Sequence, residues 1–309
     1  MDMDDRPDRI DIGRLAIPSF AVVVVVFAGL RLASIEPWAM PAYDAYAYWL
    51  TSAGVDYSAT YQGATGAYLY SPAFAQLIAP LVALPWPVFL ALWTLLIAAP
   101  LAWLAGRYAL PLLVLPPVFM SVALGQLDLA FAAVVLLGLR WPALWALPIL
   151  TKITPGIGLL WFLVRGEWRA LGIAALATAA LALASAVVDP AAWGGWMLML
   201  ARMDFPELGG GLWFLPLPLG FRLFVAAALI AWGAATDRRW VVPVGVCLSL
   251  PTVWLNSPTI LVAILPMVAA GARTPAGAWL RRAVPSVPFE VQRRQLEAQL
   301  DRWRRRLAT

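Results

Sequence analysis

The sequence predicts an all-α, polytopic integral membrane protein with about ten membrane segments. Hydrophobic residues make up 62% of the 309 residues, and charged residues make up only 13%, against roughly 25% in soluble domains. The charges also gather at the two ends, because residues 1–14 hold 8 of them and residues 272–309 hold 12. This composition excludes a soluble enzyme, a disordered chain and a nucleic-acid-binding protein.

Apolar windows along the chain predict the membrane segments, since about 20 helical residues cross the hydrocarbon core. The windows are residues 15–33, 86–106, 108–127, 128–139, 141–164, 170–188, 212–236 and 240–272. Prolines and glycines in 141–164 predict two short helices that meet at Lys152 and return to the same side; one continuous span is the alternative. The last window is too long for one span and is expected to break at Asn256-Ser257-Pro258.

The positions of arginine predict the orientation, because cytoplasmic loops carry an excess of positive charge. With both termini in the cytoplasm, most loop arginines fall on the inner side of the plasma membrane. Residues 1–271 then form a single transmembrane domain with external loops at 34–85 and 189–211. Residues 272–309 form a cytoplasmic, amphipathic, basic tail that is expected to bind membrane phospholipids.

The absence of histidine narrows the chemistry. Without imidazole, histidine-based metal sites and Ser-His or Cys-His catalysis are excluded. A single cysteine, Cys247, excludes an intrachain disulfide. Acid–base chemistry must therefore use carboxylates. No spacing of acidic residues indicates a metal site, so neither a metal nor another cofactor is expected.

The first external loop is rich in aromatic residues. Seven of the eight tyrosines lie between residues 43 and 70. A short helix is expected over 42–53, with Asp44 and Tyr48 on one face. In one interpretation the aromatics form an interfacial belt and Asp44 caps the helix. In the other, Asp44 is a general base among aromatics that bind substrate; the candidates are Tyr46, Tyr48, Trp49 and Tyr70.

Ionisable residues within membrane segments indicate function by default. Lys152 is the only lysine. Its charge either binds a phosphate or extends from a helix end to the membrane interface. The predicted hairpin would place it too deep in the membrane to contact Asp44. Arg222 is the stronger candidate for a leaving phosphate, with a structural ion pair as the alternative. Asp128 is expected to pair with either cation or to orient a substrate hydroxyl. Arg202, in the second external loop, is a weaker candidate for contact with an acceptor.

Several short motifs, in this order, resemble the lipid-carrier-dependent glycosyltransferases of the GT-C fold, and in particular family 87. This family includes the mannosyltransferases that build phosphatidylinositol mannosides. The motifs are Tyr43-Asp44, Tyr68-Leu69-Tyr70-Ser71-Pro72, Gly125-Gln126-Leu127-Asp128 and Thr151-Lys152-Ile153-Thr154-Pro155. The third is similar to the family's Gly-Gln-x-Asn/Asp turn, and the fourth to its Lys-x-x-Pro segment. The likeness is firm over about residues 36–169.

The resemblance implies that a sugar, mannose in that group, is transferred from a polyprenyl-phosphate donor to a lipid or glycan acceptor outside the cytoplasm. Asp44 matches the family's catalytic acid in the first loop, which implies a general base and, with no carboxylate paired to it, inversion. Gln126 and Asp128 belong to a motif expected to contact substrate. A transporter or lipid flippase, or a silent lipid-binding relative, is the alternative; an inverted repeat would favour a transporter, and we find none.

Overall fold

The computed structural model describes residues 12–33, 42–58, 60, 66–203, 215, 217–268, 274–283 and 294. Every regular element in these ranges is an α-helix or a 3₁₀ helix, which confirms the all-α class. The amphipathic stretch predicted over 289–307 lies outside the described residues, except for Arg294, as does most of the second external loop after Met203.

Four long helices follow predicted windows closely, although α12 begins later than its window. They are α1 (Ile12–Leu32), α4 (Trp86–Ala105), α10 (Trp168–Val188) and α12 (Leu219–Ala235). The two segments that were predicted to be external also contain helices: α2 (Tyr43–Trp49), η1 (Leu50–Ala53), α3 (Pro72–Val82) and α11 (Pro190–Arg202). The short helix expected over 42–53 is therefore present as α2 followed by η1.

Prolines divide other windows into short helices, because proline removes a backbone donor and clashes with the preceding turn. The window 108–127 becomes α5 (Ala109–Leu113) and α6 (Pro116–Leu124), and α6 meets α7 (Asp128–Gly138) at a bend of 103°. The last window breaks as predicted into α13 (Val241–Ser249) and η5 (Ser257–Met267). A final helix, α14, spans Pro275–Ala283.

The window 141–164 is broken, as its prolines predict. It contains η3 (Pro142–Trp145), α8 (Ala146–Lys152), η4 (Thr154–Leu159) and α9 (Leu160–Val164). The break falls at Ile153, whose φ of 54° is uncommon for a β-branched residue. Lys152 thus stands at the end of a helix and next to an irregular turn. The same-side return of this segment stays a prediction.

Fewer long spans are found than the apolar windows suggested. The described residues contain two helices long and apolar enough to cross a membrane, at Trp86–Leu113 and Trp168–Val188, or three if α6 and α7 count as one bent span. The prediction of about ten segments is not confirmed, because the breaks shorten apolar windows into helices of 4 to 11 residues. Large apolar side chains such as Leu176 (73% exposed) and Val187 (84%) face outward from α10, as expected for contact with lipid.

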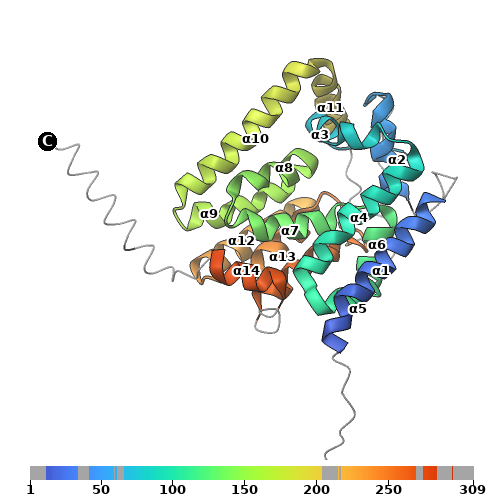
Figure 1. Ribbon diagram of the computed structural model, residues 1–309. Helices are drawn as coiled ribbons and strands as arrows, with labels where there is room; N and C mark the ends of the chain where they lie inside the picture. The colour runs from blue at the N-terminus through green and yellow to red at the C-terminus, as the bar shows by residue number, and fades with distance from the viewer. Residues whose placement is uncertain are drawn as a thin grey trace, which may run out of the picture.

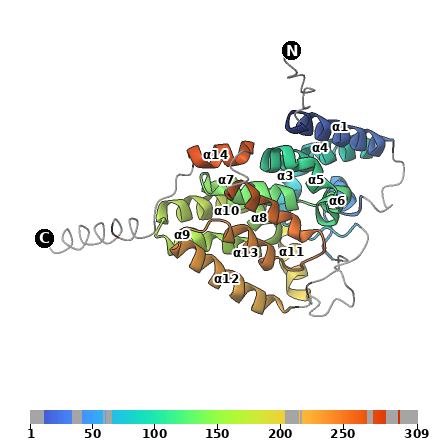
Figure 2. The ribbon, with the colours of Figure 1, turned by 90° about the horizontal axis from the view of Figure 1, so that it is seen from below.

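The helices pack around α7 and α8, and α2, α3 and α11 gather at one end (Figure 1). Seen from below, α1 and α12 lie on opposite sides of the molecule (Figure 2), and each packs along a neighbour, α4 and α13 respectively. The interior contains the fully buried Trp145, which lies against Gly138 and Gly158. A side chain at either glycine would collide with this indole.

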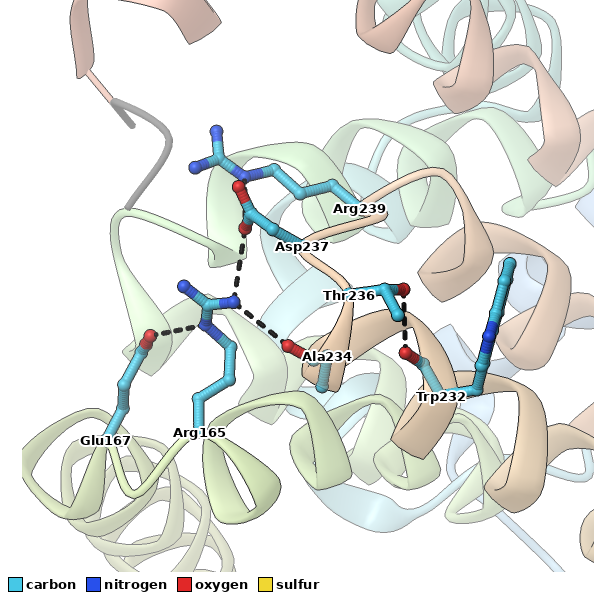
Figure 3. A network of polar contacts seen from close by, with 7 residues as sticks. All are labelled: Arg165, Glu167, Trp232, Ala234, Thr236, Asp237 and Arg239. Carbon is cyan, nitrogen blue, oxygen red and sulfur yellow. Dashed lines mark hydrogen bonds and ion pairs between the residues drawn. The ribbon is translucent and has the colours of Figure 1, made fainter. Parts of the chain in front are cut away.

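An ion-pair cluster ties two of the loops together at the other end of the bundle. Arg165, which follows α9, donates from Nε to Glu167 at 3.0 Å and pairs through Nη1 with Asp237 at 3.1 Å and with the carbonyl of Ala234 at 3.0 Å (Figure 3). Asp237 also lies 3.9 Å from Nε of Arg239. This cluster joins the loop before α10 to the loop after α12, which fits a structural function.

Candidate active site

Asp44 lies in the first turn of α2 and is half-buried. The residue that caps this helix is Ala42, so Asp44 does not have the capping function of the first interpretation. Instead its carboxylate lies near the side-chain amide of Gln126, which favours the charged form. The amide of Gln126 is almost completely buried, and its own Oε1 has no protein partner among the described residues.

Glycine at position 125 allows this contact. Its φ of +83° favours glycine, and a Cβ there would lie 2.6 Å from the Cβ of Ala45. The Gly125 carbonyl accepts a hydrogen bond of 2.9 Å from Nε1 of Trp93. The Gly-Gln turn therefore lies directly against the helix that carries Asp44.

Asp128 follows in the same turn and is fully buried at the first residue of α7. Its Oδ2 accepts hydrogen bonds from Nδ2 of Asn256 at 2.7 Å and from Oγ of Ser121 at 3.4 Å. Its Oδ1 has no hydrogen-bond partner within the described ranges. From the sequence, Asn256 was predicted only to interrupt the last apolar window. Its polar amide within a long uncharged run was the feature that could have marked it as a site residue.

Lys152 reaches this cluster, contrary to the expectation that it lies too deep. Its Nζ lies 5.7 Å from the ring centroid of Tyr70 and 5.7 Å from that of Phe131. It interacts electrostatically with the side chain of Tyr70 and with the carboxylates of Asp128 and Asp44. The expectation failed because it assumed a helical hairpin of normal depth, whereas the chain turns at Ile153.

The segment before α3 fixes Tyr70 beside Lys152. Ser71 donates from both its backbone nitrogen and its hydroxyl to the carbonyl of Leu150 in α8. The hydroxyls of Tyr70 and Tyr48 are 3.1 Å apart, and their rings stack at 5.5 Å. Burial raises the pKa of both phenols, so both stay protonated and can donate hydrogen bonds.

The other two aromatic candidates lie apart from the charged groups. Tyr46 stacks on Trp49 at 6.3 Å, and both contact Trp86. Nε1 of Trp49 donates to the carbonyl of Leu84 at 2.9 Å. These contacts attach α2 to the start of α4. Binding of substrate by Tyr46 and Trp49 stays a prediction.

Arg222 is engaged by backbone carbonyls. Its guanidinium donates to Leu217 at 2.9 Å, Leu248 at 2.8 Å, Leu250 at 2.6 Å and Pro251 at 2.8 Å. These contacts tie α12 to the irregular segment after α13 and favour a structural function. Contact with a phosphate stays a prediction for Arg222.

A second buried arginine, Arg31 at the end of α1, was not singled out from the sequence. It donates to Thr94 Oγ1 at 3.2 Å and to the carbonyls of Val122 at 3.2 Å and Ala123 at 2.6 Å. Through these bonds it supports the end of α6, directly before the Gly-Gln turn. Its position near the end of an apolar window was the sequence feature that could have identified it as a buried cation.

Arg202 is exposed at the end of α11 and lines a separate external groove of about 310 Å³. The groove is also lined by Asp56 and Asp189. The candidate residues therefore divide into a cluster of Asp44, Gln126, Asp128, Lys152, Tyr48 and Tyr70, and several outlying residues.

The charge of the cluster sets the protonation of Asp44. The pKa of this carboxyl is raised to about 7, mainly by burial. The Lys152 ammonium and the Gln126 side chain lower it, and the charge of Asp128 raises it. Two carboxylates share one ammonium, so one of them binds a proton readily. At neutral pH Asp44 exists in both protonation states, as a general base requires.

In this helical membrane protein, a carboxyl group whose pKa is about 7 lies in one cluster with an ammonium and two phenols, and such a cluster can support acid–base chemistry. Among protein families, Glycosyltransferase family 87 matches residues 68–258. The match covers more than half of the chain, so the protein belongs to glycosyltransferase family 87 and is a membrane glycosyltransferase. No curated protein and no solved structure matches the chain. Gln126, Asp128, Lys152 and Asn256 lie inside the matched range, and Asp44 precedes it.

Proposed function

We propose that this glycosyltransferase moves mannose from a polyprenyl-phosphate donor to a hydroxyl of a lipid or glycan acceptor at the external face of the plasma membrane. Both termini lie in the cytoplasm in this proposal. The observation that carries it is the contact of Asp44 with a buried turn that also faces Lys152. In this proposal, the base and the phosphate-binding charge belong to one cluster, whose helix α2 lies at the end of the bundle where α3 and α11 also gather (Figure 1).

In the proposed reaction, the acceptor oxygen forms a bond to the anomeric carbon while the bond from this carbon to the phosphate oxygen breaks. The acceptor proton passes to the carboxylate of Asp44, and the phosphate leaves with the electron pair of the broken bond. A single displacement of this kind inverts the anomeric configuration. Asp44 is not completely buried, which supports access from the acceptor side.

Lys152 is proposed to receive the negative charge of the leaving phosphate. No ion pair closes on its ammonium in the described part of the chain, so it can interact with an incoming anion. Charge stabilisation of this kind acts strongly in a site of low polarity. Tyr70 and Tyr48, which stay protonated, supply further donors. No divalent cation takes part in this proposal, because no ligand spacing in the sequence indicates one.

The experiment that tests the proposal measures transfer of labelled mannose in proteoliposomes that contain the purified full chain. One set receives polyprenyl-phosphate mannose and a lipid acceptor extract, and a second receives a nucleoside-diphosphate mannose, both in the presence of EDTA. We expect labelled product only from the polyprenyl donor. Transfer from the nucleotide donor alone, or transfer that EDTA abolishes, would contradict the proposal.

The proposed base also predicts how the rate depends on pH. Asp44 must be deprotonated to accept a proton, and its pKa is about 7. We therefore expect kcat/KM to increase as the pH rises through about 7 and to level off above it. Initial rates over about two pH units on either side of neutrality would measure this. A rate that is constant or falls over this range would show that another group is the base.

A further inference from the structure

Asp128 is bound by a residue from the C-terminal half of the chain. Its Oδ2 accepts the 2.7 Å hydrogen bond from Asn256, a residue 128 positions later in the sequence. Asn256 is almost fully buried and immediately precedes η5, which packs along α7. A buried carboxylate requires hydrogen bonds or an opposite charge to remain ionised, and this amide is its shortest hydrogen bond among the described residues.

Asp128 is one of the two carboxylates that attract the Lys152 ammonium. A lysine side chain is flexible, and its ammonium is a compact point charge. The rings of Phe131 and Tyr70 each lie 5.7 Å from Nζ, and the carboxylate of Asp128 attracts it electrostatically. An Asp128 that turned or became neutral would release the ammonium toward Asp44 or toward solvent.

We propose that Asn256 and Asp128 form a positioning pair that fixes the Lys152 ammonium for catalysis. The pair acts in two ways: Asn256 stabilises the charged form of Asp128, and the charged Asp128 holds Lys152. The hydrogen bond from Asn256 therefore disfavours binding of the cluster's exchangeable proton to Asp128. This inference rests on the proposed function of Lys152, and it adds a residue from the C-terminal half of the chain to the site.

The amide is better suited to this task than a second charge. It donates one hydrogen bond without changing the net charge, so the balance of two carboxylates and one ammonium is kept. The titratable groups around this centre are Asp44, Tyr48, Tyr70, Lys152 and Cys247. Only Lys152 among them is a cation, so the position of one side chain controls the compensation of both carboxylates.

A double-mutant cycle tests the positioning pair, because a residue that acts through Lys152 has no effect once Lys152 is replaced. We expect Asn256→Ala to lower kcat/KM for the polyprenyl donor by about tenfold in the otherwise unaltered chain, since hydrogen bonds to charged groups are among the stronger ones. In the Lys152→Met background, the same substitution should change kcat/KM less than about twofold. Equal loss in both backgrounds would overturn the proposal.

Thr259→Val serves as the matched control. Thr259 is fully buried in η5, close to Asn256 in sequence, and its hydroxyl has no partner among the described residues. We expect this variant to retain the unaltered rate. A loss equal to that of Asn256→Ala would indicate a general effect of changes in η5 and would contradict a specific pair. An unaltered rate in Lys152→Met itself would instead refute the proposed function of Lys152.

Asp128→Asn gives a second test that depends on pH and not on the total rate. Removal of this negative charge lowers the pKa of Asp44, because Asp128 contributes to the rise of that pKa. The acid limb of the kcat/KM profile should therefore move to lower pH, while the plateau falls because Lys152 is no longer held. A plateau that falls with an unmoved acid limb would show that Asp128 only stabilises the fold.

Discussion

Asp44→Asn is expected to lower kcat/KM for mannose transfer by about 10² to 10⁴, which is the usual contribution of a positioned general base. The amide has nearly the same shape as the carboxyl group, so the contact of α2 with the Gly-Gln turn should be retained. It cannot accept the proton of the acceptor hydroxyl. Initial rates with saturating acceptor, measured in proteoliposomes, give the effect directly.

Asp56→Asn is the matched control for this prediction. Asp56 lies in the same external segment, is exposed, and accepts a hydrogen bond from the backbone of Ser58. We expect this variant to transfer mannose at the unaltered rate. An Asp44→Asn enzyme as active as Asp56→Asn would remove Asp44 from the mechanism, and the thermal unfolding temperatures of both variants would show whether either has a folding defect.

Lys152→Met should have the second-largest effect, a decrease of about 10² to 10³ in kcat/KM for the donor, similar to the loss of one preorganised donor at a developing negative charge. Methionine keeps the length and the apolar stem of the side chain but removes the ammonium. The two carboxylates then lack compensation, and one of them remains protonated at neutral pH. The measurement is the same transfer assay, with the concentration of donor varied.

Lys152→Arg and Arg238→Met define the cause of that decrease. Arginine keeps the positive charge but replaces the compact ammonium with a planar group, so we expect partial activity. Arg238 is an exposed cation that lies 5.5 Å from the ring centroid of Trp232, outside the cluster, and its replacement should not change transfer. Full activity of Lys152→Met would exclude its proposed contact with phosphate.

Several parts of the site could be predicted from the sequence. Asp44 is a carboxylate in a loop rich in aromatic residues, in a chain that contains no histidine. Lys152 is the only lysine in the chain. Both stand out because an ionisable residue in apolar surroundings is energetically costly and is usually retained for a function. The break after Lys152 was also predictable, since prolines and glycines on either side of it prevent a continuous helix.

Other parts depend on tertiary contacts that no local pattern contains. The 103° bend between α6 and α7 and the turn at Ile153 together bring Asp128 and Lys152 toward Asp44, whereas straight spans would have kept them apart. In the sequence, Arg222 resembled a phosphate ligand because it is a cation within an apolar window. Its structural function follows only from its four backbone carbonyl partners, which the sequence does not indicate. Asn256 contacts Asp128, which lies 128 residues earlier in the sequence. The sequence Asn256-Ser257-Pro258 therefore predicted the break between two helices, but it did not predict the contact with Asp128.

The central claim is a division of functions, in which Asp44 acts on the acceptor and Lys152 acts on the donor phosphate. Equilibrium binding of polyprenyl-phosphate mannose to Asp44→Asn and Lys152→Met, measured in the absence of acceptor, tests this claim most directly. We predict that Asp44→Asn binds the donor with unaltered affinity but does not transfer the sugar, and that Lys152→Met binds the donor more weakly. Equal weakening of donor binding in both variants would contradict this division.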